Sequence, residues 1–504
     1  MSRLEAKKPS LCTGEPLAHE QVRAALSVLK GITASCYGPS GRLKQVHNGH
    51  GGYMCTSSQS SALLGHLAVT HPLLKILRTA VQNQAACFGD CGLFTAILSC
   101  SLIESDQRLG LTPATVVKVN KCLLSLCTNY LRSEACRCRI PVDFSRSQIL
   151  LCLVRSVLTS KPACMLTRKE IEHISSVILR AFLLMIPETA EDHLVLGKAI
   201  IVPLKGHSVM DSVVLPGILI EMSEVQFRRI LPFKKSSLLS SHRIIVIDRL
   251  GVTLMEPLRM VTGTQPIGSL GHVSLSSYGS VKNVCPAQFG SKHFLHLIPD
   301  EATVCSLLLG NRNDSAWDEL KLTCQSALHV LQLTLKEPWV LLGGGCTETH
   351  LAAYIRHEVH KEPAGILSDE GGTRTELELV AEAFCRALEA LASSLEHDGG
   401  GTLTDTRHGH CWSVQADPPS GVGWTELLSR CGCGLLSSQE GLSWAYLGSA
   451  CPPFAPHACL PPTAPDSASS LTVDCLTAKL GGLQVAVETA NLILDLSYVI
   501  EDKN

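Results

Sequence analysis

Apolar residues recur at every third or fourth position through much of this 504-residue chain. This spacing places them on one face of a helix, so it predicts amphipathic helices. We expect helices over residues 20–31, 72–84, 94–104, 114–132, 147–159, 168–184, 314–335 and 375–395. The last helix of the chain carries an apolar stripe, with Asp474 as its expected N-cap. The stripe consists of Leu476, Leu480, Leu483, Val487, Ala490 and Leu494.

Strand patterns gather in the middle of the chain. Residues 194–203 are expected to enter a strand pair, residues 214–220 form a buried strand, and residues 292–309 alternate as strands do. Helices therefore dominate both ends, and strands lie between them. This order predicts a multi-domain α+β protein, because 504 residues are enough for two or three domains.

Composition restricts the class of partner. The chain is 45% hydrophobic and 17% charged, and its net charge is −2, with a mean hydropathy of +0.20. Such a surplus of apolar surface favours an oligomer or a large complex. The charge excludes a basic nucleic-acid-binding protein. The longest apolar runs are too short for a membrane span, and the N-terminus lacks a signal peptide's apolar region. We therefore expect a cytosolic or nuclear protein whose 23 cysteines are thiols.

A run of three glycines, Gly343 to Gly345, follows a short apolar segment and precedes a helix with Glu348 in its first turn. Glycines allow a backbone to come very close to a ligand or to another backbone. A helix N-terminus also favours anions such as phosphate. The plainer alternative is a strand-to-helix turn packed against a neighbour. The turn alone leaves both interpretations open.

Other short motifs stand upstream in a fixed order. GPSG covers residues 38–41, THPLLKIL residues 70–77 and GDCG residues 89–92; GGGCTE then begins at Gly343, and the chain closes on NLILDLSYVIEDKN. This order resembles the group II chaperonins, the ring-forming folding machines of the eukaryotic cytosol. Their nucleotide pocket carries GPxG, GDGTT and GGGxxE in the same order. The resemblance covers nearly the whole chain.

The resemblance implies a site for ATP or ADP with magnesium. The matching nucleotide-contacting residues are Gly38, Pro39, Gly41, Gly89, Asp90, Gly92, Gly344 and Gly345. Asp90 matches the residue that holds the magnesium ion. Both threonines of GDGTT are absent here, because the motif reads GDCGL. We therefore expect nucleotide binding to be weakened.

The family's two hydrolytic aspartates fall on Ser58 and Ser326. A hydroxyl cannot act as a carboxylate base at neutral pH, and general-base help is worth about 10²–10⁴ in rate. We expect no catalytic residues here and little or no ATP hydrolysis. The chain would then be a chaperonin-like chaperone or assembly factor. The alternative is an ATP-dependent chaperone that hydrolyses ATP to fold its clients.

The resemblance also implies a domain plan. A mainly helical equatorial domain covers residues 1–140 and 343–504, with a Gly- and Pro-rich loop at 398–470. An intermediate domain covers residues 141–205 and 291–342, and a truncated α/β apical domain covers 206–290. Only residues 223–241 join the two halves of the apical segment. The family places several strands and a lid helix there, so roughly fifty or more residues are missing relative to a typical domain.

Partners and location follow from the resemblance as well. It implies association with other chaperonin-like subunits and with the cytosolic chaperonin. The nearest members of the family imply clients from the Bardet–Biedl protein complex (the BBSome), which serves cilia. The expected location is the cytosol, with the centrosome or ciliary basal body and the nucleus as further sites.

One group of metal-binding residue types lies within the Gly- and Pro-rich loop. It consists of His408, His410, Cys411, Cys431 and Cys433. Zinc binds such side chains, but the HxH and CxC spacings differ from the usual CxxC pairs. The spacing favours ordinary loop residues over a metal site, and the sequence leaves the question open.

Overall fold

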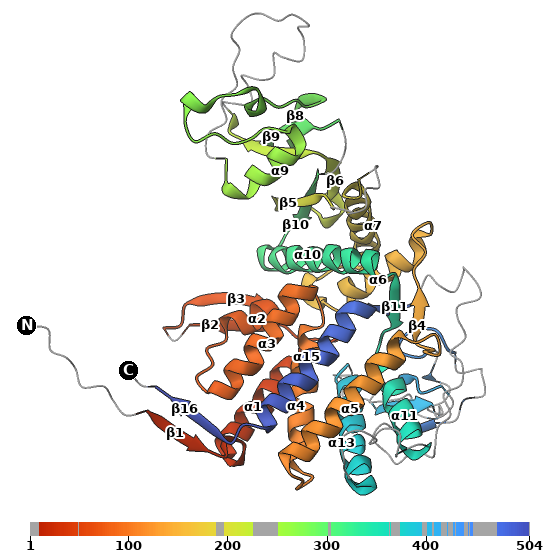
Figure 1. Cartoon of the computed structure of the whole chain (residues 1–504). Helices are drawn as coiled ribbons and strands as arrows, with labels where there is room; N and C mark the ends of the chain where they lie inside the picture. Colours follow the sequence, from red (N-terminus) through yellow and green to blue (C-terminus); the bar gives the residue numbers. More distant parts are fainter. Residues whose placement is uncertain are drawn as a thin grey trace, which may run out of the picture. The chain divides into compact units, whose positions relative to one another are not determined.

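The computed structural model divides the chain into two compact units (Figure 1). Unit 1 comprises Met1–Ala163 and Gln325–Asn504, and unit 2 comprises Cys164–Cys324. The structure describes residues 10–48, 50–187, 196–224, 250–300, 304–361, 363, 373–395, 401–405, 408–414, 421, 427–428, 430–437, 442, 444–446 and 471–502.

Unit 1 is mainly helical and is built from both ends of the chain. Its longer helices are α1 (Glu20–Ala34), α3 (Pro72–Phe88), α4 (Gly92–Gln107), α5 (Pro113–Arg132), α6 (Ser147–Thr159), α11 (Cys346–Lys361), α13 (Arg374–Ser393) and α15 (Leu476–Leu494). A short helix, α2 (Ser60–His66), precedes α3. Helix α10 (Asp314–Lys336) begins in unit 2 and ends in unit 1.

Helices α4 and α15 form the centre of unit 1 and lie side by side (Figure 1). Helix α4 is buried on nearly all sides, as expected of a helix with apolar residues around its whole circumference. Gly481 lets α15 approach α3 closely, because a Cβ there would stand 2.8 Å from the Phe88 ring. Gly482 lets α15 approach α4 in the same way, because a Cβ there would stand 3.1 Å from the Phe94 ring. The Ser99 hydroxyl of α4 also donates a hydrogen bond to the Ala486 carbonyl of α15 at 3.1 Å.

Short sheets join distant parts of unit 1. Strands β1 (Leu11–Gly14) and β16 (Tyr498–Glu501) pair antiparallel and bring the two chain ends together. Strand β11 (Trp339–Leu342) lies between β15 (Val473–Cys475) and β4 (Arg139–Pro141). A hairpin pairs β2 (Lys44–His47) with β3 (Tyr53–Ser57). Strand β12 (Gly401–Asp405) lies between β13 (Cys411–Val414) and β14 (Trp444–Tyr446).

Unit 2 is an α/β unit with two three-stranded sheets. In one, β10 (Val304–Asn311) lies between the parallel strand β5 (Lys198–Lys205) and the antiparallel strand β6 (Val213–Pro216). In the other, β9 (Lys292–Ile298) lies between β7 (Ile218–Met222) and β8 (Asn283–Phe289). Helices α7 (Arg168–Leu184) and α9 (Val252–Thr262) complete the unit.

A single glycine, Gly217, connects a strand of one of these sheets to a strand of the other. The sequence predicts one buried strand over 214–220, but the structure has two strands, β6 and β7, in different sheets. Gly217 separates them with φ +86°, a conformation that favours glycine. A Cβ there would stand 2.0 Å from the Leu297 carbonyl oxygen. The apolar run is therefore broken by backbone geometry, which the hydrophobic pattern does not reveal.

The helix predictions agree closely with the structure, and one capping prediction is wrong. The helices over 147–159 and 168–184 have the predicted bounds. Asp474, in contrast, is not the N-cap of the last helix, because α15 begins at Leu476 after Cys475. Asp474 lies in strand β15 and forms an ion pair instead. The division into three domains, including the apical boundary at 206–290, stays a prediction. Across the described part of the chain, no helix is both long and apolar enough to cross a membrane.

A buried polar network joins three helices of unit 1. Asn120 of α5 donates hydrogen bonds from Nδ2 to Asp106 Oδ2 of α4 at 2.9 Å and to Asn491 Oδ1 of α15 at 3.1 Å. All three residues are buried. Burial raises the pKa of Asp106 to about 7, although the bond from Asn120 acts to lower it. The native protein therefore holds a proton on Asp106 that the unfolded chain releases near pH 4.

This raised pKa makes Asp106 a source of pH-dependent instability. Stability contributed by the proton is present at low pH and is lost as the pH rises from about 4 to about 7. We predict that Asp106→Asn raises the free energy of unfolding at pH 8, by at most about 4 kcal/mol. At pH 5 the gain should be much smaller, about 1–2 kcal/mol, because the native carboxyl group keeps its proton there. Circular dichroism melts at both pH values test this, and an equal effect at pH 5 and pH 8 would contradict it.

Candidate functional site

The three glycine motifs of unit 1 converge on one lysine. Lys479 lies on the first turn of α15 and is buried. Tyr37 precedes the GPSG motif, Cys91 lies in GDCG, and Glu348 ends GGGCTE; all three interact electrostatically with the Lys479 ammonium group. Motifs that are hundreds of residues apart in the sequence are therefore gathered around a single buried cation.

Two carboxylates hold the Lys479 ammonium group. Its Nζ lies 2.6 Å from Glu348 Oε1 and 2.8 Å from Asp474 Oδ2, and 4.6 Å from the centre of the Phe94 ring. Burial alone would lower the pKa of Lys479, but Asp474 and Glu348 together hold it well above its ordinary value. The lysine is therefore charged, and it ties α15 to the first turn of α11.

The glycines at this junction are packed against protein. A Cβ on Gly344 would stand 2.1 Å from the Gly432 carbonyl oxygen, and one on Gly38 would stand 2.6 Å from the Leu395 side chain. Gly345 faces Ala392 at 3.1 Å in the same way. Both Gly344 and Gly345 also adopt positive φ angles. Internal packing thus accounts for these glycines, as the plainer interpretation of the triple-glycine turn expects.

The GDCG motif keeps an unusual backbone conformation. Gly89 ends α3 with φ +69°, and Cys91 precedes α4 with φ +62°. A non-glycine residue in this left-handed region costs about 1–2 kcal/mol. Gly92 is tightly enclosed, because a Cβ there would stand 2.1 Å from the Ser60 hydroxyl oxygen. The turn is thus retained even where cysteine occupies a position with positive φ.

Asp90, the predicted magnesium ligand, lies half-buried in this turn. Burial raises the pKa of its carboxyl group, and the nearby charge of Lys161 opposes that rise. Lys479 also interacts with this carboxylate. The Asp474 carboxylate also acts on Asp90, so charges of both signs surround this position. The assignment of Asp90 as a magnesium ligand stays a prediction.

Ser58 and Ser326, the positions where the resemblance places the family's hydrolytic aspartates, both lie in unit 1. Ser58 follows strand β3 and is fully buried, and Ser326 lies half-buried on α10. Neither position supplies a carboxylate, so neither offers a base for water. The assignment of Gly38, Pro39, Gly41, Gly89, Asp90, Gly92, Gly344 and Gly345 to a nucleotide stays a prediction.

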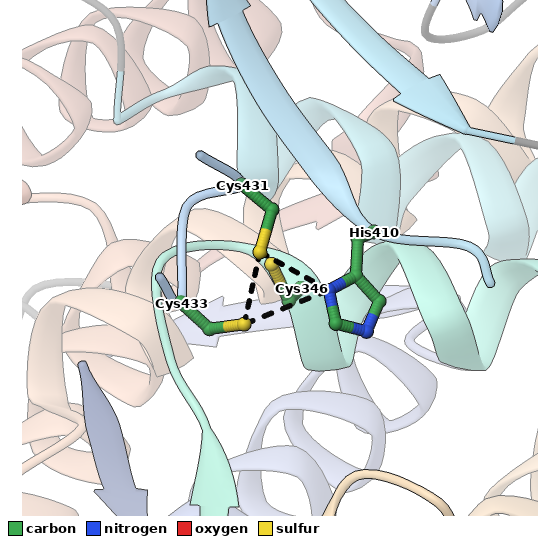
Figure 2. Close-up of side chains that lie close together, drawn as sticks. All are labelled: Cys346, His410, Cys431 and Cys433. Atoms are coloured by element: carbon green, nitrogen blue, oxygen red, sulfur yellow. Dashed lines mark hydrogen bonds between the residues drawn. The ribbon is translucent and has the colours of Figure 1, made fainter. Parts of the chain in front are cut away.

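A separate cluster forms where the sequence leaves a metal site open. Cys346, His410, Cys431 and Cys433 bring three sulfur atoms and one ring nitrogen within 4.8 Å of one another (Figure 2). All four residues are buried. The interpretation of these histidine and cysteine residues as ordinary loop positions therefore does not describe their surroundings.

The cluster differs from the predicted group in three members. His408 pairs with Asp405 at 3.3 Å, and Cys411 is buried in β13 outside the quartet. Cys346, the first residue of α11, takes part instead. The three glycines before Cys346 suggest a phosphate site in the sequence, and Cys346 is 64 residues from His410. Hydrogen bonds bring the two segments together, because Cys346 Sγ lies 3.8 Å from the Cys411 carbonyl oxygen and His350 Nδ1 lies 2.8 Å from the His408 carbonyl oxygen.

Comparisons with known proteins identify the same family that the order of the motifs indicates. The sequence profile of the TCP-1/cpn60 chaperonin family matches residues 29–236 and 233–504. The chain is 64% identical to Molecular chaperone MKKS of Homo sapiens and 61% identical to that of Mus musculus, over 100% of both chains. It is 26% identical to Thermosome subunit gamma of Saccharolobus shibatae over 35% of this chain and 31% of that protein.

The comparisons also bear on the length of the middle segment. The alignment with the human protein spans 570 positions, whereas this chain has 504 residues, so at least 66 positions lack a residue of this chain. The family profile matches as two segments, and the interruption between them falls at residues 233–236, where the two matches overlap. The interruption falls within residues 223–241, where the sequence predicts a shortened apical segment; most of that stretch lies outside the described residues.

The Lys479 ion pairs give a stability prediction. Removing one partner of a buried ion pair leaves an uncompensated charge and costs about 3–5 kcal/mol. We expect Lys479→Met to lower the free energy of unfolding of unit 1 by about that amount, and Lys479→Met with Glu348→Gln to recover part of it. Lys75→Met is the control, because Lys75 is exposed on α3. Thermal melts of the three variants and the parent test this prediction. Equal melting temperatures for Lys479→Met and Lys75→Met would contradict it.

Proposed function

Because the chain belongs to the TCP-1/cpn60 chaperonin family, we propose that it is a chaperonin-like assembly factor with little or no ATP hydrolysis. It would hold client subunits or join other chaperonin-family subunits. The observation that carries the proposal is that both hydrolytic positions are serines, Ser58 and Ser326, within a retained scaffold.

The surroundings of the predicted nucleotide site support this proposal. The gathered motifs are held by internal contacts, namely the Lys479 ion pairs and the packing of Gly38 and Gly344. Such contacts allow the scaffold to fold without a nucleotide in the site. The motif also lacks both threonines of GDGTT, because it reads GDCGL. ATP or ADP would bind weakly if at all, and the scaffold would serve in protein association.

The partners follow from the family. Thermosome and T-complex protein 1 subunits match about a third of this chain, which supports association with chaperonin-type subunits. We further propose that the clients are subunits of the Bardet–Biedl protein complex, handled together with the cytosolic chaperonin. The chain would act in the cytosol and at the centrosome or ciliary basal body.

The native size of the tagged full chain in a cell lysate tests this function. We predict that it migrates at high mass with chaperonin-like subunits and Bardet–Biedl subunits, which mass spectrometry identifies. Depleting the lysate of ATP with apyrase should leave this complex unchanged, because hydrolysis is not required. A lone monomer, or association with general stress chaperones only, would contradict the proposal. Dispersal of the complex on ATP depletion would favour the ATP-dependent alternative.

A further inference from the structure

Four buried side chains in unit 1 have the geometry of a closed tetrahedral metal site. Cys431 Sγ lies 3.3 Å from Cys433 Sγ, and His410 Nδ1 lies 3.3 Å and 3.5 Å from these two sulfur atoms. Zinc bonds of about 2.3 Å to sulfur and about 2.0–2.1 Å to nitrogen require ligand separations of about 3.5–3.8 Å. Small outward shifts of these atoms would therefore accommodate the ion.

The four ligand atoms point toward one another from three separate segments (Figure 2). Cys346 comes from the start of α11, His410 directly precedes β13, and Cys431 and Cys433 lie on residues 430–437. Every member is at most 4% exposed. The arrangement thus supplies four protein ligands and shields them from solvent, as structural zinc sites do.

Backbone hydrogen bonds fix the two loop segments in place. The Asp405 carboxylate accepts bonds from the His410 amide at 3.0 Å and the His408 amide at 2.5 Å. The Gly432 amide donates to the Cys411 carbonyl at 2.8 Å and joins the two segments. Ligands held by such an outer shell keep their orientation before a metal binds.

The surroundings of two cysteines also suit thiolates. The Leu436 amide donates a hydrogen bond to Cys431 Sγ at 3.2 Å. Cys346 is the first residue of α11, where the helix N-terminus favours negative charge. Thiolates rather than thiols bind metals, and helix N-termini promote them.

We propose that Cys346, His410, Cys431 and Cys433 bind one Zn²⁺ ion in a closed structural site. Three sulfur ligands and one imidazole in tetrahedral geometry select zinc over magnesium or calcium, which prefer oxygen. The ion would fasten residues 430–437 and the β12–β13 hairpin to the start of α11, beside the triple-glycine turn. This site is independent of nucleotide binding and of the proposed function.

A disulfide is the main competing use of these cysteines. A disulfide bond between Cys431 and Cys433 would use two of the three sulfur atoms. Cys346 and His410 would then have no metal ion to bind together with them. The structure has all three cysteines as free thiols. Zinc, in contrast, engages all four side chains at once.

Metal analysis of the full-length chain, purified without chelators, tests the proposal. We expect about one zinc per chain by mass spectrometry of the metal, with three sulfur and one nitrogen ligands by X-ray absorption. Cys346→Ser and Cys431→Ser should each lose most of the zinc, whereas His410→Cys should retain it. Cys411→Ser is the matched control, because Cys411 is equally buried and adjacent to His410 but outside the quartet.

The analysis of the parent chain decides the matter even if a serine variant fails to fold. Removal of the metal by a chelator should also lower the melting temperature of the parent, since binding and folding are coupled. Absence of zinc from the parent, an oxygen-rich coordination shell or a Cys431–Cys433 disulfide in its place would overturn the proposal. So would equal zinc contents in Cys346→Ser and Cys411→Ser.

Discussion

The buried ammonium group of Lys479 is the contact on which the centre of unit 1 depends. It joins Glu348 at the start of α11 to Asp474 of β15, and it lies against the Phe94 ring of α4. Removing three charged groups from water is costly, so they persist only because each has an opposite partner within 3 Å or so. This arrangement places the GPSG, GDCG and GGGCTE segments around one point, where internal ion pairs hold α15 to the first turn of α11.

The order of the family's motifs is retained at this junction, while residues within the motifs differ. Cys91 has a left-handed backbone conformation at the place where the family motif GDGTT has its second glycine. That conformation is unfavourable for cysteine by about 1–2 kcal/mol, and it persists because α3 and α4 are fixed against α15. The resemblance to the family places its two hydrolytic aspartates at the buried Ser58 and the half-buried Ser326. A chaperonin scaffold without its reactive groups is suited to association, which fits the apolar composition of the chain.

Helices and the family were predictable from sequence because both depend on local patterns: periodic apolar residues and short motifs in order. Contacts between distant segments were not. Lys479 falls on the apolar stripe between Leu476 and Leu483, and a lysine on a buried helix face indicates an ion pair, but the pattern alone does not identify its partners. Asp474 was assigned to a cap for the same reason. The sequence does not predict Cys346 as a member of the metal cluster, because Cys346 meets His410 through tertiary contacts such as the hydrogen bond between His350 and the His408 carbonyl.

The central claim is that this chain keeps the chaperonin scaffold without the ability to hydrolyse ATP. Steady-state phosphate release by the purified full chain, compared with its Asp90→Ala variant, tests it most directly. We predict that the two proteins release phosphate at the same background rate, because no carboxylate is present at Ser58 or Ser326 to activate water. Robust turnover by the parent chain that Asp90→Ala abolishes would contradict the account.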